Sequence, residues 1–249
     1  MQTEIHETAI VMPGAEIGAG CSIGAFSIIG SMARIEDHVT IGSHCELGVE
    51  TGTLPSAPLI IGSSSFIRSG SVFYQGSRFG AHLKTGHRVT VREGITAGKG
   101  LQIGTMSDLQ GHCSIGDYVR LHSNVHIGQK TKIGNFVWIF PYVVLTNDPH
   151  PPSEYLQGCS VGDFAVIATM STVLPGREIG KDVLIGAMTL VKNNVPSSTI
   201  YSGVPGQVVG NIDKVKFKNT GESVYPWRRH FHRGYPTQIV EEWKKEFEN

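Results

Sequence analysis

Histidines are the residues whose spacing gives this sequence its clearest chemical content. His87 lies in the segment TGHRVT, and His122 and His126 flank a serine and an asparagine in LHSNVHIG. Because imidazole titrates near neutral pH, a histidine can take a proton from a hydroxyl or an amine that attacks a carbonyl carbon. The first hypothesis is therefore a general base, with His87, His122 and His126 as candidates.

A polar segment downstream could hold the acceptor of such a reaction. The run VVLTNDPHPPS contains Asn147, Asp148 and His150, and Asn124 lies between two of the histidines. A carboxylate attracts an ammonium group and orients it. Because Asn-Asp-Pro is also a favourable turn sequence, the segment supports both a substrate contact and a simple turn.

A repeat that fills most of the chain must position these residues. A large apolar residue recurs every six positions over 5–47, 61–145 and 161–191, and only Thr85 and Ala97 depart from the pattern. This period fits neither a helix nor an alternating strand, but it fits a short strand followed by a corner. Three hexads then close a triangular turn of about 18 residues, with the first and fifth positions pointing inward.

The hexad positions also indicate which side chains face outward. None of the candidate histidines has an inward position, and His87 should lie above Thr105 and Ser123. Thr85 should narrow the core beneath His87 and offer a hydroxyl nearby. The four cysteines lack CxxC spacing, so we expect small core residues rather than disulfides or structural zinc.

The hexads, with IGKDVLIGAMTLVKNNVPSSTIYSGVPGQVVGNI at 179–212, resemble the hexapeptide-repeat acyltransferase superfamily. The resemblance implies an all-β solenoid, a left-handed parallel β-helix, which we assign to residues 1–210. Interruptions of the repeat predict loops at about 53–60 and 151–160. A C-terminal extension over 211–249 should contain an α-helix, because its last apolar residues have helical spacing.

The same resemblance implies acyl transfer from acetyl-CoA. TGHRVT resembles the hexad that carries the catalytic base in acyltransferases of the lipid A pathway, and the TND segment resembles N-acetyltransferases of nucleotide-linked amino sugars. His150 before proline resembles the O-acetyltransferase branch, which is the alternative. The donor would contact Ala168, Gly186, Ala187, Lys192 and Pro205.

Two further alternatives are a non-catalytic structural coil and a γ-class carbonic anhydrase. His82 and His87 have that enzyme's five-residue spacing but differ from it in hexad phase, so we predict no metal. The formal net charge is zero, so there is no excess positive charge of the kind that binds nucleic acid or an anionic membrane. We expect a cytoplasmic homotrimer in which one subunit supplies His87 and its neighbour the loop with Asn147 and Asp148.

Overall fold

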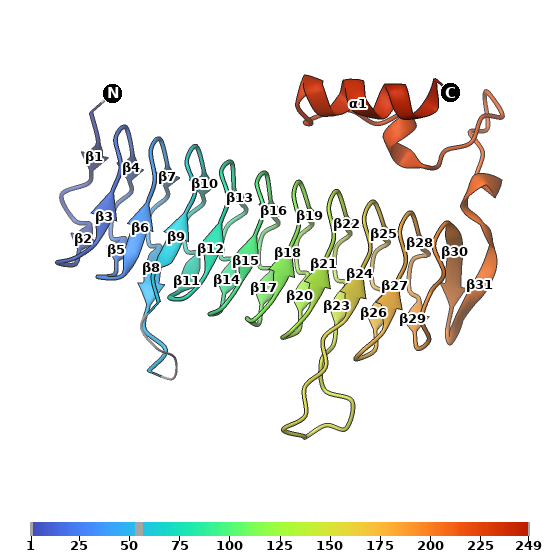
Figure 1. Ribbon diagram of the computed structural model, residues 1–249. Coiled ribbons are helices and arrows are strands. Elements are labelled where there is room, and N and C mark those ends of the chain that lie inside the picture. Colours follow the sequence, from blue (N-terminus) through green and yellow to red (C-terminus); the bar gives the residue numbers. More distant parts are fainter. Residues whose placement is uncertain (1, 53–56, 249) are drawn as a thin grey trace.

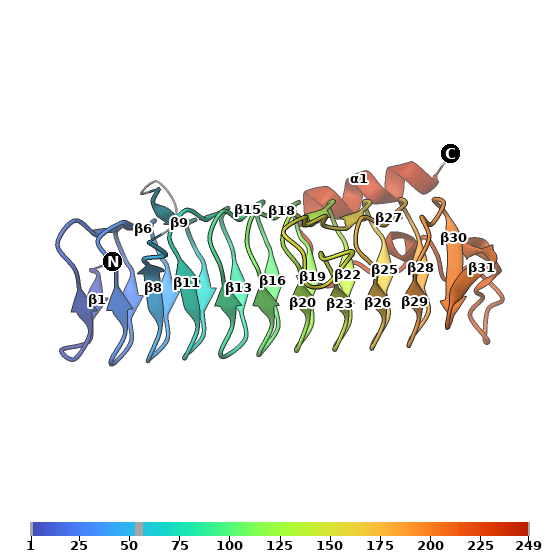
Figure 2. The same cartoon turned by 90° about the horizontal axis from the view of Figure 1, so that it is seen from below.

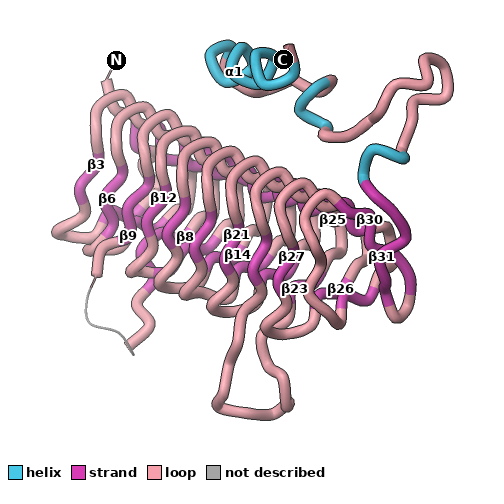
Figure 3. The backbone as a smooth tube through the Cα atoms, turned by 45° about the vertical axis from the view of Figure 1, so that its right-hand side comes forward, coloured by secondary structure: helices cyan, strands magenta, loops and turns pink. Residues whose placement is uncertain are grey.

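The computed structural model describes residues 2–52 and 57–248. The chain winds into a long coil of short strands, with parallel pairing between successive turns (Figure 1). Glu4 pairs with Ser22 and Lys84 with Gln102, which confirms the predicted turn length. Within the described ranges the strands form three sheets of 12, 10 and 9 strands, here called walls A, B and C. Figure 3 shows these walls as three magenta rows.

Wall A contains β1 (Glu4–Ile5), β4 (Ser22–Ile23), β7 (Thr40–Ile41), β10 (Phe66–Ile67), β13 (Lys84–Thr85), β16 (Gln102–Ile103), β19 (Arg120–Leu121), β22 (Trp138–Ile139), β25 (Val166–Ile167), β28 (Leu184–Ile185), β30 (Thr199–Gly203) and β31 (Gly206–Asn211). Wall B contains β2 (Ile10–Val11), β5 (Ile28–Ile29), β8 (Glu46–Val49), β11 (Val72–Tyr74), β14 (Thr90–Val91), β17 (Asp108–Leu109), β20 (His126–Ile127), β23 (Val144–Leu145), β26 (Thr172–Val173) and β29 (Leu190–Val191). Wall C contains β3 (Glu16–Ile17), β6 (Ala33–Ile35), β9 (Leu59–Ile61), β12 (Arg78–Phe79), β15 (Thr96–Ala97), β18 (Ser114–Ile115), β21 (Lys132–Ile133), β24 (Ser160–Val161) and β27 (Glu178–Ile179).

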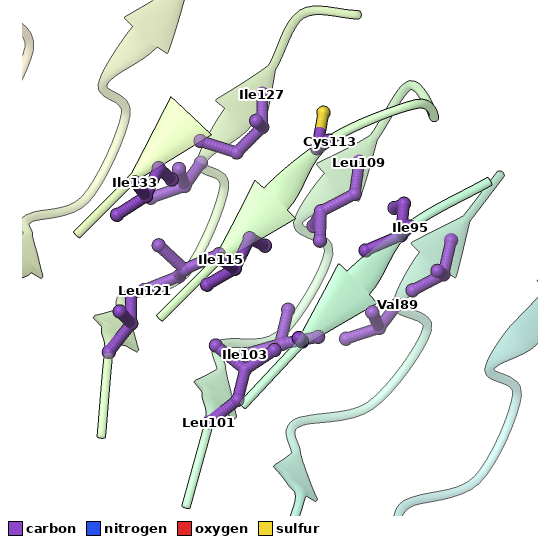
Figure 4. Close-up of a cluster of buried hydrophobic side chains, with 14 of the residues drawn as sticks. Val89, Ile95, Leu101, Ile103, Leu109, Cys113, Ile115, Leu121, Ile127 and Ile133 are labelled. Carbon is purple, nitrogen blue, oxygen red and sulfur yellow. The ribbon is translucent and has the colours of Figure 1, made fainter. Parts of the chain in front are cut away.

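The core is a set of apolar columns inside the prism, one side chain above another from turn to turn. Figure 4 shows part of it, with Ile103, Leu109 and Ile115 from the three walls pointing inward. All four cysteines are free and buried, as predicted. Among the described residues the repeat is exposed at its first turn, where Ile5 and Val11 are 46% and 36% exposed, because no described turn packs beneath it.

Both interruptions of the repeat leave the coil at the corner between walls B and C, and Figure 1 shows the second loop projecting from this edge. Of the first predicted loop, residues 53–56 lie outside the described residues, and the coil resumes at Leu59, earlier than expected. The second loop fills 146–159, between β23 and β24, so it begins before the predicted residue 151.

The C-terminal extension turns back along the corner between walls C and A, away from the loops (Figure 1), and Figure 2 shows α1 running along the later turns of the coil. It contains η1 (Ile212–Lys214), η2 (Trp227–Arg229) and α1 (Thr237–Phe247), which confirms the predicted helix. Trp227 and Trp243 pack on a column of stacked rings that includes Phe136 and Phe164. No helix among the described residues is long and apolar enough to cross a membrane.

Candidate functional site

The best-oriented histidine is His126, on the outer face of wall B. Its Nδ1 lies 3.2 Å from Oδ2 of Asp108, its ladder partner one turn earlier. An ionised carboxylate only accepts hydrogen bonds, so Nδ1 carries the proton and donates to Asp108. With the proton on Nδ1, the neutral form of the ring has an unprotonated Nε2, which is what a general base requires.

Asp108 is held in its ionised form by its neighbours. Its Oδ2 also accepts a hydrogen bond of 2.5 Å from Nε2 of Gln110. Burial alone would raise the pKa of Asp108, but the hydrogen bonds from His126 and Gln110 and the nearby charge of Arg92 together lower the pKa below its ordinary value. Sequence reasoning missed Asp108, although it has the same hexad position as His126 one turn earlier.

The loop with the TND segment begins beside this pair. A Cβ on Gly128, two residues after His126, would lie 3.1 Å from Cβ of Asn147. The structure therefore places Asn147 against Gly128, two residues after His126, where the chain leaves wall B.

Asp148, in contrast, contacts its own loop. Its Oδ1 accepts hydrogen bonds from the backbone N–H of His150 at 2.9 Å and from Oγ of Ser153 at 2.7 Å. Its Oδ2 accepts one from the backbone N–H of Ser153 at 2.9 Å. The bond from the Ser153 hydroxyl, with those from the two N–H groups, lowers the pKa of Asp148. Its contacts are those of a turn.

His122 points out from wall A rather than wall B, because the corner at Ser123 and Asn124 separates it from His126. Its ring stacks on Phe140 with centroids 4.6 Å apart. Burial, and after it the charge of Arg120, lowers the pKa of His122, which favours the neutral ring. Arg120 packs over Trp138, and a groove of about 340 Å³ lies here.

His87 lies exposed at the corner between walls A and B, in a hollow of about 440 Å³ that also contains His44 and Arg88. Its backbone N–H donates to Oγ1 of Thr105 at 3.2 Å, as the predicted stacking requires. No carboxylate contacts its ring within residues 2–52 and 57–248. The hydroxyl of Thr85 is used elsewhere, because it accepts a 2.9 Å hydrogen bond from the Arg68 N–H.

The positions predicted to meet the donor all lie in the last turns of the coil. Ala168 and Gly186 follow wall A strands, Ala187 lies at the A–B corner, and Lys192 follows β29 on wall B. Pro205 lies in the turn between β30 and β31. A Cβ on Gly186 would come within 2.6 Å of the Ser202 hydroxyl, so this glycine has a packing role as well.

The histidine pair that suggested a carbonic anhydrase is separated in space. His82 lies at the corner between walls C and A, whereas His87 lies at the corner between walls A and B. In the part of the chain that the structure describes, no group of three His, Cys, Asp or Glu residues could hold a metal ion.

No protein-family model matches the chain, but several curated proteins do. It is 27% identical over 158 residues to WbbJ of Escherichia coli, named for O-acetyl transfer in lipopolysaccharide biosynthesis, with 55% of this chain and 81% of that protein covered. It is 30% identical over 135 residues to a serine acetyltransferase of Staphylococcus epidermidis, covering 53% of this chain and 51% of the enzyme. A galactoside O-acetyltransferase of Escherichia coli is 27% identical over 118 residues, covering 39% and 58%. The chain thus spans only about half the length of the last two relatives.

Among solved structures, a UDP-N-acetylglucosamine acyltransferase of Arabidopsis superposes with a TM-score of 0.70 at 18% sequence identity. The match covers 98% of this chain and 89% of that chain. It identifies the coil as a left-handed parallel β-helix.

Proposed function

We propose that this chain, a member of the hexapeptide-repeat acyltransferase superfamily, transfers an acetyl group from acetyl-CoA to a sugar carried on a nucleotide. The observation that carries the proposal is the pair of His126 and Asp108 on wall B. It supplies an oriented base at the exposed surface, beside strand β23, whose end leads into the loop with the TND segment.

The reaction needs one proton to be moved twice. Nε2 of His126 accepts the proton of the acceptor group as that group attacks the thioester carbonyl. The carbon–sulfur bond then breaks, and the imidazolium returns the proton to the departing thiolate of coenzyme A. Asp108 stabilises the transient charge on the ring, as a carboxylate does behind a catalytic histidine. The products are an acetylated sugar and free coenzyme A.

The acceptor group is either an amine, as the TND segment predicts, or a hydroxyl. Two observations favour the hydroxyl. The carboxylate of Asp148, which the amine prediction needs to attract an ammonium group, already accepts three hydrogen bonds within its loop. Two of the relatives are also named for O-acetyl transfer. The amine stays the second candidate.

A homotrimer would supply the cleft that a single prism lacks. Large apolar side chains form a column along the corner between walls A and B, interrupted by His44, Arg88 and Asn124 in some turns: Phe26 (58%), Met106 (53%), Tyr142 (57%), Met170 (56%) and Met188 (64%). Burying such a column at a threefold axis removes it from water. Wall A of one subunit would then face wall B of the next, across a cleft that admits both substrates.

The direct test measures release of free thiol from acetyl-CoA in the presence of nucleotide sugars with and without an amino group. We expect release with at least one of them and a product heavier by one acetyl group. Mild alkali distinguishes the two acceptors, because it cleaves an ester and leaves an amide. Absence of thiol release with the whole panel would instead favour a structural coil.

A further inference from the structure

A groove on wall A carries the positive charge expected of an anion-binding site. It is lined by Lys84, Arg120 and Arg233, with His122 and Ser123 at the end nearest the A–B corner, and no carboxylate lines it. Lys84 and Arg120 point outward from strands β13 and β19, two turns of the coil apart. Arg233 comes from the C-terminal extension, so this side of the groove exists only because the extension docks on wall A.

Arg120 is the unusual member, because it is half-buried without a counter-ion. Its guanidinium lies 4.5 Å from the ring centroid of Trp138 and 4.4 Å from that of Tyr235. Its Nη2 donates to the backbone oxygen of Arg233 at 3.0 Å, and no Asp or Glu in the described chain forms an ion pair with it. The rings hold the cation in place, and its remaining N–H groups are suited to a bidentate anion.

The groove shares Trp138 with a neighbouring hollow of about 210 Å³, whose walls are aromatic and aliphatic side chains. Phe231 and Tyr225 of the extension form one side of this hollow. The extension is fixed in position, because Nε1 of Trp138 donates to the Tyr235 hydroxyl at 2.9 Å. A cationic groove beside an aromatic hollow matches a diphosphate joined to a planar base.

We propose that this part of wall A binds the nucleoside diphosphate of the acceptor, with the phosphates at Arg120, Lys84 and Arg233 and the base on the aromatic hollow. The sugar would then extend toward His122 and the A–B corner, where wall B of a neighbouring subunit brings its His126. The inference rests on the proposed function for the sugar, but nucleotide binding itself can be measured without any turnover.

Coenzyme A also contains a nucleoside diphosphate, so the experiment must separate donor from acceptor. Isothermal titration calorimetry on the full chain at one fixed ionic strength would use uridine, guanosine, cytidine and thymidine diphosphates, inorganic pyrophosphate and coenzyme A as separate probes. We expect at least one nucleoside diphosphate to bind more tightly than pyrophosphate, because the base adds its own contacts.

Three variants test the residues. Arg120→Gln should weaken binding of that nucleotide by about tenfold or more, and Lys84→Gln should weaken it severalfold. Lys84 is exposed, so its variant stays informative if Arg120→Gln destabilises the extension. Lys132→Gln removes the same charge at the same hexad position on wall C and should bind as the wild type does.

Several outcomes would overturn the proposal. The first is that no nucleoside diphosphate binds. The second is that the Arg120, Lys84 and Lys132 variants all bind the nucleotide with the same affinity. The third is that the Arg120 and Lys84 variants lose affinity for coenzyme A alone. Failure of the proposed catalytic function looks different: nucleotide binding would depend on Arg120 and Lys84, but His126→Gln would leave thiol release unchanged.

Discussion

Nδ1 of His126 lies 3.2 Å from Oδ2 of Asp108, and the two residues are ladder partners on neighbouring turns of wall B. The parallel pairing of the strands thus sets the orientation of the imidazole ring, which a loop would set less firmly. A base positioned by the repeat itself needs no rearrangement before it accepts a proton.

Asp108→Asn should lower kcat for acetyl transfer by roughly 10²-fold, because an amide neither fixes the productive tautomer nor stabilises the imidazolium. Steady-state thiol release measures the effect. Asp213→Asn, an exposed change of the same kind outside the coil, should keep wild-type turnover. Wild-type kcat in a folded Asp108→Asn protein would show that the carboxylate plays no part.

Thr85→Val should lower the free energy of unfolding by about 1–3 kcal/mol, because the Arg68 N–H loses its acceptor inside the coil. Thr85→Ser keeps the hydroxyl and should lose less. Urea denaturation followed by circular dichroism compares the two. Equal stability of Thr85→Val and the wild type would mean that this hydrogen bond contributes nothing.

Docking of α1 should weaken in acid. The hydrogen bond from Arg228 lowers the pKa of Glu246 below its ordinary value of 4.5. A carboxyl with a lowered folded-state pKa contributes stability above the unfolded value and loses it as the pH falls through the folded value. Hydrogen-exchange protection of α1 should therefore fall below about pH 4.5.

Glu246→Gln should remove most of this pH dependence, whereas Glu242→Gln, on an exposed residue of the same helix, should retain it. Identical profiles for the two variants would assign the acid sensitivity to another group.

Met170→Glu should disrupt the proposed trimer, because it places a charge among the apolar side chains at the A–B corner. Sedimentation velocity measures the assembly. Met12→Glu is the matched control, since Met12 is also exposed but lies after β2, at the corner between walls B and C. A trimer that survives Met170→Glu would place the subunit contact on another surface.

Features that depend on neighbouring residues in the sequence could be predicted, whereas contacts between distant segments could not. The inward columns depend on a period of six, so the coil could be predicted, whereas the exposure of Ile5 depends on which turns pack against it. His122 and His126 are close in sequence but lie on different walls, and only their hexad positions distinguish them. Asp108 could have been found one turn before His126. Arg233 could not have been, because it meets Arg120 across 113 residues through the docked extension.

The most direct test of the account compares His126→Gln with the wild type in thiol release, using the nucleotide sugar that gives the highest wild-type rate. The side chain is outside the core, so the variant should show the same thermal unfolding. If His126 is the base, the variant has a kcat lower by roughly 10² or more. Full turnover in the folded His126→Gln protein, together with a comparable loss in His87→Ala, would contradict it and assign the base to His87.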